Sequence, residues 1–398
     1  MEQEPMNHTS SAPVRRRRTP YQRNRSLQGR LLALLLVGTV AVFVLLGLLQ
    51  KDRSFSDSEN RKLASFPEAS AWKDGSFLRE LGAYTADQFP FRDGWISLNL
   101  RMNQMLGSRE ANGVYLCSND YLMQVPGEPN EAQLSRNLEA VNAFAAAHPG
   151  LNAYMTVVPN AVTVLSDYLP ANAPVRDQAA DLAGIAEKLQ NVSFLDVTQA
   201  LTDHKDEYLF YRTDHHWTSL GALYAFRSMA PAMNLPQAET AEYTVYPVSR
   251  TFEGTLSSRS GSHRTTDTVE IYIPRTEIDY YVSNPGTGEE ISSFYHREAL
   301  NQKDHYTVFF GGNHPRLDVI TTADTGRSLL LFKDSYANCM VQFLYPYFDH
   351  ITILDPRYYY DNVELVLKSE GITDVLWLYN LDTFLSDTSL ADVLSAGA

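Results

Sequence analysis

The densest group of residue types that can do catalysis lies in the segment Tyr211–Ala222. Asp214 stands two residues before His216, and a carboxylate at that spacing can fold back in a turn to accept the Nδ1 proton of the imidazole. Such a contact orients the ring and stabilises its charged form during base catalysis. A pair of histidines capping a helix that begins near Thr218 is the plainer interpretation, and this segment alone favours it.

A nucleophile of a suitable kind lies much further along the chain, at Ser335. It follows the apolar run Ser328–Phe332 and precedes helix-forming residues, so we place it at the carboxyl end of a parallel strand, where the active sites of open α/β folds gather. Backbone amides at a helix N-terminus face developing negative charge. A serine that only caps the helix would have the same local setting. Asp334 is adjacent to Ser335 and cannot easily reach the far nitrogen of the histidine, so it is not predicted as the third member.

Two other chemistries draw on residues of these regions. A metal site could take its ligands from a set of carboxylates and imidazoles, namely Asp203, His204, Asp214, His215 and His216. Adjacent histidines on an extended segment point to opposite faces, so we do not expect His215 and His216 to share one ion and predict no metal site. Cys339, one helical turn beyond Ser335, is an alternative nucleophile, although a cysteine inside a helix more often packs in the core.

The elements that must position these residues alternate between short apolar runs and helical patterns from about Leu106 to Leu394. This alternation predicts an α/β fold with a parallel sheet flanked by helices. The clearest strands are 153–158, 328–332, 351–354 and 375–379. Helices predicted to start near Tyr336 and Tyr360 separate the last three strands, so the C-terminal third reads as β-α-β-α-β with parallel pairing.

The stretch from about Phe252 to Tyr306 has a different composition, dominated by Thr, Tyr, Val, Ile and Gly. We interpret it as an antiparallel β elaboration beside the main sheet, with strands at Val269–Ile273 and Tyr280–Val282. A further strand is predicted at Thr307–Phe310.

A membrane-spanning helix is predicted at residues 31–49, where 19 residues carry no charge. About 20 apolar residues are needed to cross a bilayer. A cleaved signal peptide would have a shorter apolar core followed by small residues, so an uncleaved signal anchor is favoured. Arginines flank the N-terminal side, at positions 15, 16, 17, 18, 23, 25 and 30, and keep that side in the cytoplasm. The main domain is therefore expected outside the cytoplasm.

Charge and cysteine content narrow the function further. The formal net charge of the whole chain is −14. Residues 1–30 contribute +5, from seven arginines and two glutamates, so residues 31–398 contribute −19. An acidic exported part argues against nucleic acid as a partner. Cys117 and Cys339 are the only cysteines, and the sequence does not show whether they form a disulfide.

These features divide the chain into four parts. We predict a basic cytoplasmic tail over 1–30, the transmembrane anchor over 31–49, a helix-prone, membrane-proximal connecting region over 50–105, and an extracytoplasmic domain over 106–398. The connecting region mixes aromatics and prolines, unlike a flexible Gly/Ser linker.

The motif Thr213–Trp217 (Thr-Asp-His-His-Trp) resembles the one for which bacterial DHHW-type membrane proteins are named. The wider frame resembles the alginate O-acetyltransferase branch of the SGNH-hydrolase superfamily, in which an Asp-x-His-Trp motif precedes the serine, and this chain has that permuted order. Further matching pieces are Glu59–Arg61, Val158–Asn160, Tyr168–Pro170, Gly311–His314 and Lys333–Asn338. The resemblance covers about residues 55–380 and implies an SGNH-hydrolase-like fold.

Carried over residue by residue, the resemblance implies Ser335 as the nucleophile, His216 as the general base and Asp214 as its orienting carboxylate. Gly312 and Asn313 could offer a backbone amide and a side-chain amide to an oxyanion. A Gly-Asn turn is also common for purely conformational reasons, and that interpretation stands slightly ahead.

The resemblance implies a serine-dependent acyl transfer, with acetyl as the expected group, to or from a cell-envelope polysaccharide. The enzyme would be an O-acetyltransferase or, with water as acceptor, an acetylesterase. Relatives depend on a multi-spanning membrane acyltransferase that supplies the acyl group, so such a partner is expected if the protein is a transferase. No nucleotide-binding glycine loop or P-loop lysine is visible, and no cofactor is expected. The alternative is a non-catalytic assembly or glycan-binding protein of the cell envelope that retains a vestigial triad.

Overall fold

The computed structural model describes residues 20–56 and 58–396, with side chains from residue 27 onward. It divides into two compact units: one comprises residues up to Ser56 together with Lys62–Gly94, and the other comprises residues 58–61 and 95–396. The arginines at positions 15–18, predicted as a topology signal, lie outside the described residues.

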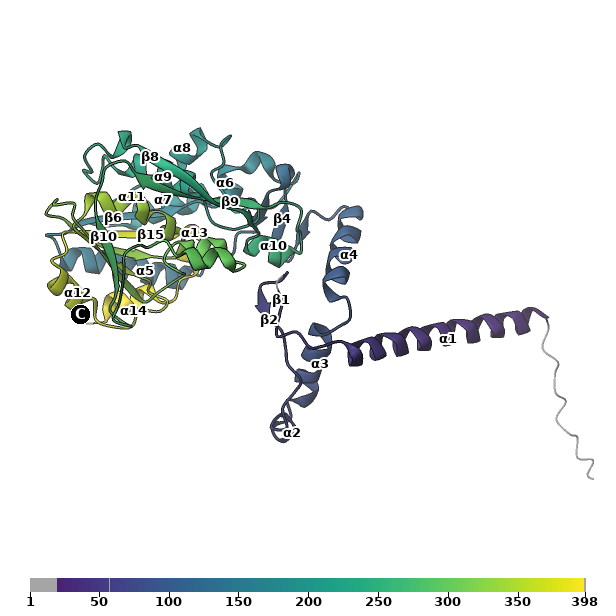
Figure 1. Ribbon diagram of the computed structural model, residues 1–398. Helices are drawn as coiled ribbons and strands as arrows, with labels where there is room; N and C mark the ends of the chain where they lie inside the picture. The colour runs from purple at the N-terminus through teal and green to yellow at the C-terminus, as the bar shows by residue number, and fades with distance from the viewer. Residues whose placement is uncertain (1–19, 57, 397–398) are drawn as a thin grey trace, which may run out of the picture. The chain divides into compact units, whose positions relative to one another are not determined.

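The first unit contains the long helix α1 (Pro20–Leu49), which is shown in dark purple in Figure 1. Its segment Leu27–Leu49 has a mean hydropathy of 2.9 over its most apolar part, and none of that part is buried inside the protein. At 1.5 Å per residue these 23 residues span about 35 Å, enough for the hydrocarbon core of a bilayer. By length and composition α1 can therefore cross a membrane.

The rest of the first unit folds back on the end of α1. It contains the short helix α2 (Ala71–Asp74) and helix α3 (Phe77–Asp87). The ring of Phe89 stacks on that of Phe43, with 5.3 Å between centroids. The side-chain amide of Gln88 accepts a hydrogen bond from the Arg53 amide (3.0 Å) and donates to the Arg53 carbonyl oxygen (2.8 Å). This part of the predicted connecting region is thus a folded element.

The second unit is built on an eight-stranded sheet in the order β11-β10-β12-β14-β13-β15-β6-β7. Five neighbouring strands pair in parallel: β14 (His350–Leu354), β13 (Ser328–Lys333), β15 (Asp374–Asn380), β6 (Asn152–Val158) and β7 (Ser193–Phe194). Three antiparallel strands extend the other edge: β12 (Arg316–Thr321), β10 (Tyr280–Asn284) and β11 (Glu289–Ile291). The α/β architecture predicted from the sequence is confirmed.

Helices cover both faces of the sheet because successive side chains of its strands point to opposite sides. In β13, Leu330 and Phe332 face one hydrophobic core while Leu329 and Leu331 face the other. Figure 1 shows helices on either side of the sheet. The first core receives α5 (Glu131–Ala147), α7 (Gln178–Lys188), α12 (Val363–Glu370), α13 (Leu381–Ser386) and α14 (Leu390–Ser395). The second receives α6 (Ala161–Val164), α8 (Thr198–Asp203), α9 (Ser219–Met229) and α11 (Val341–Leu344).

Smaller elements complete the chain. A two-stranded antiparallel sheet consists of β8 (Tyr243–Phe252) and β9 (Asp267–Pro274), and α10 (Thr255–Ser260) lies between them in sequence. A three-stranded sheet consists of β3 (Glu110–Ala111), β4 (Val114–Leu116) and β5 (Leu122–Gln124). The remaining elements are α4 (Arg92–Met105), β1 (Phe55–Ser56), β2 (Arg61–Lys62) and seven 3₁₀ helices within the described residues: η1 (Ser118–Asp120), η2 (Ser166–Tyr168), η3 (Ala238–Thr240), η4 (Arg297–Asn301), η5 (His305–Val308), η6 (Ser335–Cys339) and η7 (Tyr345–Tyr347).

All four strands of the predicted parallel core are confirmed, each extended by one or two residues. Part of the predicted antiparallel elaboration joins the main sheet instead of lying beside it, because β10 pairs with both β11 and β12. The predicted strand at Thr307–Phe310 is wrong. That stretch begins in η5, where the side chain of Asp304 accepts a hydrogen bond from the Tyr306 amide (3.1 Å) and starts a helical turn.

Candidate active site

The three residues predicted as a triad come together at the carboxyl end of β13. Nδ1 of His216 lies 2.5 Å from Oδ1 of Asp214, and Nε2 of the same ring lies 2.7 Å from Oγ of Ser335. Asp214 and His216 are 3 % and 6 % exposed, whereas Ser335 is half-buried and can be reached from outside. A carboxylate, an imidazole and a hydroxyl thus form one unbroken chain of hydrogen bonds, and its last contact joins two residues that are 119 positions apart in sequence.

Asp214 has hydrogen-bond donors on both carboxylate oxygens. Oδ1 also accepts from the backbone amide of His216 (3.0 Å), and Oδ2 accepts from the amide and the hydroxyl of Thr255, both at 2.8 Å. Thr255 is the first residue of α10, so the helix start supplies these donors. The carboxylate is therefore held in one orientation towards the ring.

The backbone before Asp214 is anchored by a second carboxylate, Asp267 of β9. Asp267 is 1 % exposed and accepts from the amides of Arg212 and Thr213, both at 2.8 Å, from the hydroxyl of Thr213 (2.5 Å) and from the hydroxyl of Tyr208. Burial raises the pKa of Asp267, and these four donors oppose that shift. The chain then turns back, since the Tyr211 amide donates to the His216 carbonyl oxygen (3.2 Å).

Aromatic rings pack around the imidazole of His216. The ring of Tyr306 stacks on it with 3.9 Å between centroids and 15° between planes, and the Tyr306 hydroxyl donates to the Ser335 carbonyl oxygen (2.9 Å). The buried indole of Trp217 donates to the Tyr336 carbonyl oxygen (2.9 Å). Tyr306 and Trp217 thus join the histidine segment to the turn that carries Ser335.

Ser335 begins the 3₁₀ helix η6 directly after β13, and its neighbour Asp334 forms the cap. The Asp334 side chain accepts from the Tyr336 amide (2.9 Å) and from the Asn380 amide at the end of β15 (2.9 Å). Burial raises the pKa of this carboxyl group. Asp334 therefore positions the turn, and it is Asp214 that contacts the histidine.

The predicted helix after the histidines starts at Ser219, and its cap is Thr218, whose side chain accepts from the Gly221 amide (3.2 Å). The capping role considered for the histidines is thus filled by Thr218.

The ionisation of the acidic groups follows from their surroundings. Burial alone would raise the pKa of Asp214, but its electrostatic interactions with the imidazoles of His215 and His216, with the hydrogen bonds from His216 and Thr255, hold that pKa far below its usual range. Burial raises the pKa of Asp304, on the same side of the site, to about 6, helped by the negative charge of Asp214. Asp214 therefore stays ionised beside the imidazole at neutral pH.

His215 lies beside His216, with ring centroids 3.9 Å apart. The expectation that adjacent histidines would point to opposite faces is wrong here, because the segment turns instead of running extended. Within the part of the chain that the structure describes, Asp214, His215 and His216 form a group whose possible ligand atoms all lie within 4.8 Å of one another. These atoms already have polar partners, since Nδ1 of His215 is 2.8 Å from the Thr255 hydroxyl.

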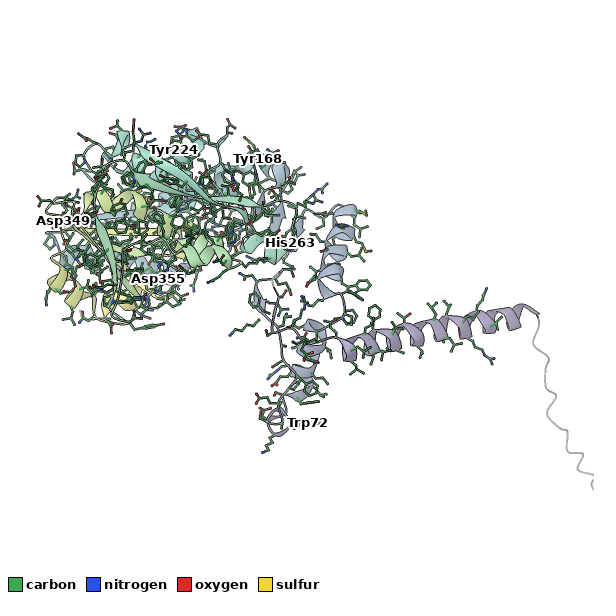
Figure 2. All side chains as sticks on the ribbon, viewed as in Figure 1. Trp72, Tyr168, Tyr224, His263, Asp349 and Asp355 are labelled. Atoms are coloured by element: carbon green, nitrogen blue, oxygen red, sulfur yellow. The ribbon has the colours of Figure 1, made fainter. Side chains whose placement is uncertain are left out.

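His204, another residue weighed as a ligand, stacks on Tyr224 with 3.6 Å between ring centroids, and Tyr224 is labelled in Figure 2. Its Nδ1 lies 2.8 Å from a carboxylate oxygen of Glu207. Its imidazole is engaged there and not with the histidine pair.

The two residues considered as oxyanion donors lie in the turn after η5. Gly311 and Gly312 have φ angles of +70° and +125°, and Phe310 before them also has a positive φ of 64°. The Gly312 amide makes only a long hydrogen bond, 3.4 Å, to the Phe309 carbonyl oxygen. Asn313 is exposed, and its side-chain oxygen accepts from Lys333 (3.0 Å) and Asn338 (3.3 Å).

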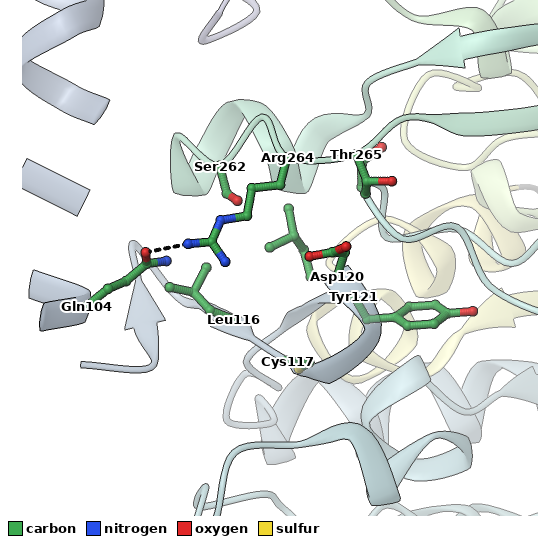
Figure 3. Close-up of a pocket in the computed structure, with 10 residues that line it drawn as sticks. Gln104, Leu116, Cys117, Asp120, Tyr121, Ser262, Arg264 and Thr265 are labelled. Carbon is green, nitrogen blue, oxygen red and sulfur yellow. Dashed lines mark hydrogen bonds between the residues drawn. The ribbon is translucent and has the colours of Figure 1, made fainter. Parts of the chain in front are cut away.

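Both cysteines are free thiols. Burial raises the pKa of Cys117 and of Cys339 to about 12 in each case, so neither is a thiolate near neutral pH. Cys339 is fully buried. Cys117 lines a pocket, drawn in Figure 3, in which Arg264 donates a hydrogen bond to Gln104 (2.9 Å).

Several residues that support the site were not identified from the sequence: Thr255, Asp267, Tyr306, Lys333 and Asn338. Thr255, Asp267 and Tyr306 bind residues that lie 41, 54 and 29 positions away. Asp267, Thr255 and Tyr306 carry no spacing signal, since only the fold brings them near the histidine segment. Lys333 and Asn338 belong to a matching motif, and a lysine directly after a buried strand was a signal that a buried cation is present.

One family model matches part of this chain. Residues 116–290 match the family model described as the SGNH hydrolase-like domain of acetyltransferase AlgX. The matched residues include Asp214 and His216 and end before Ser335. A search of curated proteins found no match.

Solved structures give a longer overlap. A DHHW family protein from Eubacterium siraeum is 25 % identical, covers 72 % of this chain and 95 % of its own, and superposes with a TM-score of 0.61. PatB1 of Bacillus cereus, solved with a sulfonyl adduct, is 19 % identical and covers 70 % of this chain and 98 % of its own. Its TM-score of 0.59 shows a shared fold. The O-acetyltransferase domain of Pseudomonas putida AlgJ is 15 % identical, covers 70 % of this chain and 94 % of its own, and has a TM-score of 0.44. The predicted resemblance to DHHW-type proteins and to the AlgX type of SGNH-hydrolase-like domain is confirmed.

Proposed function

We propose that this protein is a serine-dependent acyltransferase that moves an acetyl group to or from a polysaccharide of the cell envelope. The observation that carries the proposal is the continuous contact from Asp214 through His216 to Ser335, at 2.5 Å and 2.7 Å. Acetyl is proposed because the matching family model is described as the SGNH hydrolase-like domain of an acetyltransferase.

The first half of the reaction forms an acyl-enzyme. Nε2 of His216 accepts the hydroxyl proton of Ser335 while Oγ attacks the acyl carbonyl carbon. Ionised Asp214 holds the other ring nitrogen in its protonated form and stabilises the imidazolium. The tetrahedral oxyanion accepts hydrogen bonds from the Asn313 side-chain amide and the Gly312 backbone amide. The carbonyl re-forms, the leaving group takes the proton from His216, and an ester on Ser335 remains.

The second half reverses these steps with a different oxygen. His216 takes the proton of an acceptor hydroxyl, that oxygen attacks the ester on Ser335, and collapse of the second tetrahedral intermediate returns the proton to Oγ. A sugar hydroxyl as acceptor makes the protein an O-acetyltransferase, and water makes it an acetylesterase. The two outcomes differ in how well the site excludes water and orients the sugar.

The proposed topology follows from α1. Residues 1–30 lie in the cytoplasm, residues 31–49 cross the membrane once, residues 50–105 connect, and residues 106–398 act outside. Acetyl-CoA is absent there, so we propose that a multi-spanning membrane acyltransferase supplies the acyl group. The strongly acidic domain would not bind nucleic acid.

The test is to incubate the full chain in detergent with p-nitrophenyl acetate and to follow the acetyl adduct by intact mass and peptide mapping. We expect an adduct on Ser335 that is absent in Ser335→Ala. In His216→Ala the rate of adduct formation should fall at least about 10²-fold, because general-base catalysis contributes typically 10²–10⁴-fold.

Adding acetyl-free envelope glycans to the preformed adduct then separates the two enzymes. Transfer of the acetyl group to the glycan supports the transferase, whereas loss to water at an unchanged rate supports the esterase. If the unaltered protein forms no adduct and does not turn over, the catalytic proposal is wrong, and a glycan-binding or assembly role takes its place.

A further inference from the structure

A buried lysine lies directly behind the proposed oxyanion site. Lys333, the last residue of β13, is 3 % exposed, and burial lowers the pKa of its ammonium group. Its Nζ is 3.0 Å from Oδ1 of Asn313 and 3.2 Å from Oδ2 of Asp355. Asp355 is fully buried and is labelled in Figure 2.

This lysine is not needed to neutralise Asp355. The guanidinium group of Arg357 already donates to both oxygens of that carboxylate, at 2.8 Å and 2.6 Å. Burying an ammonium group costs free energy that a single ion pair seldom regains. The presence of Lys333 as a second cation beside the Asp355 carboxylate therefore needs another explanation. The contact of Lys333 with Asn313 supplies one.

The contact with Lys333 determines which way the Asn313 side chain faces. An ammonium group can only donate, so the atom at 3.0 Å must be the amide oxygen. The Asn338 side-chain nitrogen donates to the same oxygen (3.3 Å), and Asn338 lies three residues beyond Ser335 on η6. The NH₂ group of Asn313 is consequently turned away from both donors, and the amide is held against the turn that Ser335 begins.

We propose that Lys333 is a positioning residue that orients and polarises the Asn313 amide as an oxyanion donor. This inference rests on the proposed function. A charged donor on the carbonyl oxygen draws electron density from the amide and makes its N–H groups stronger donors. The positive charge is in place before reaction, so no reorganisation is needed when the oxyanion forms.

The first test replaces Lys333 by methionine, which has similar length and no charge. Asp355 keeps Arg357 as its partner, so the fold is expected to persist, and a thermal melt checks this. We expect the rate of Ser335 acylation by p-nitrophenyl acetate to fall about 10- to 100-fold with little change in KM, since loss of an oxyanion donor outright costs about 10²–10³-fold. In the matched control, Arg357→Met, Asp355 loses its other cation and the rate should stay within about threefold.

The decisive readout is coupling between Lys333 and Asn313. In an Asn313→Ala background, Lys333→Met should slow acylation by less than about twofold, because the group it acts through is gone. A full and independent effect in that background, or a normal rate in Lys333→Met alone, overturns the inference while leaving the proposed function intact. Absence of any adduct in the unaltered protein removes both.

Lys333→Gln covers the case in which the methionine variant does not fold. It keeps an N–H donor at that position and loses the charge, so its rate should lie between those of the unaltered protein and Asn313→Ala. A rate equal to that of the unaltered protein would show that the charge is not used.

Discussion

His215 is the residue at which the chemistry of the site should affect stability. Burial and the adjacent charge of His216 lower the pKa of its imidazole to about 4. In the unfolded chain that pKa is about 6.5. The stability that neutral His215 contributes is therefore fully present above pH 6.5 and is lost as the pH falls towards 4, because the unfolded state takes up the proton first.

This predicts that the free energy of unfolding falls more steeply with acidification in the unaltered protein than in His215→Gln. Between pH 7.5 and 4.5 the free energy of unfolding should fall by about 1–2 kcal/mol more in the unaltered protein than in His215→Gln. The difference is no larger because the ring is still partly exposed. Urea denaturation of the full chain in detergent at both pH values measures it. Parallel slopes would mean that His215 is protonated as easily in the folded state as in the unfolded one.

At the residue scale, the sequence was informative where the contact is local. The two-residue spacing of Asp214 and His216 made their contact possible, but that segment alone favoured helix capping, and the resemblance to DHHW-type proteins was needed to predict the triad. The strand before Ser335 was enough to place the hydroxyl at the end of the sheet. The supports of these residues come from distant segments, as Asp267 and Tyr306 show. The side-by-side packing of His215 and His216 depends on a turn whose hydrogen bonds involve residues far along the chain.

At the scale of elements, the start of α10 determines the position of Asp214. Gly254 immediately precedes this helix, with an ordinary φ of −82°. A Cβ atom there would collide with the side chain of Asp214 and would lie 2.8 Å from its Cα. The glycine is thus required by close approach and not by backbone conformation.

Gly254→Ala should therefore displace Asp214 from the ring and lower kcat at least about tenfold, because misplacement by 1 Å can cost about 10²-fold. Its effect on the melting temperature should be smaller than its effect on kcat. The control is Gly184→Ala in α7, where an added Cβ meets nothing within 4 Å and should add about 0.5–1 kcal/mol of stability without changing kcat. Normal turnover in Gly254→Ala would show that Asp214 tolerates the shift.

The elements that could be predicted are those buried on both faces. β13, β14 and β15 are nearly continuous apolar runs, which is typical of parallel strands between two helical layers. β12 was missed because Arg316 and Asp318 interrupt its pattern, although Asp318 is buried and accepts hydrogen bonds from the Thr352 hydroxyl (2.7 Å) and from Arg316 (2.8 Å). The apolar stretch after Asp304 reaches the core as a helical turn, which composition alone does not distinguish from a strand.

At the scale of the whole molecule, α1 predicts how the protein behaves in cells. The full chain should remain in the membrane fraction after washing with alkaline carbonate, whereas a chain that begins at residue 51 should be released. The reason is the apolar segment Leu27–Leu49, whose most apolar part is not buried inside the described part of the protein.

Fractionation of bacteria expressing either form measures this difference, and the intact mass of the full chain also distinguishes an anchor from a cleaved signal peptide. Release of the full chain by carbonate would contradict a spanning helix. Retention of the shorter chain would show that a second membrane contact exists outside α1.

The folded segment between Arg53 and Asp93 also limits how far the chain can extend from α1. A fully extended segment of this length would cover about 130–140 Å. Here its ends are joined, because the Arg53 guanidinium donates to the Asp93 carboxylate (2.9 Å) and Gln88 holds the Arg53 backbone from both sides. These forty positions therefore add almost no tether length. A variant that loses the contacts of Arg53 with Asp93 and Gln88 could therefore extend further from α1 than a variant with a few inserted residues, although it has no added residue.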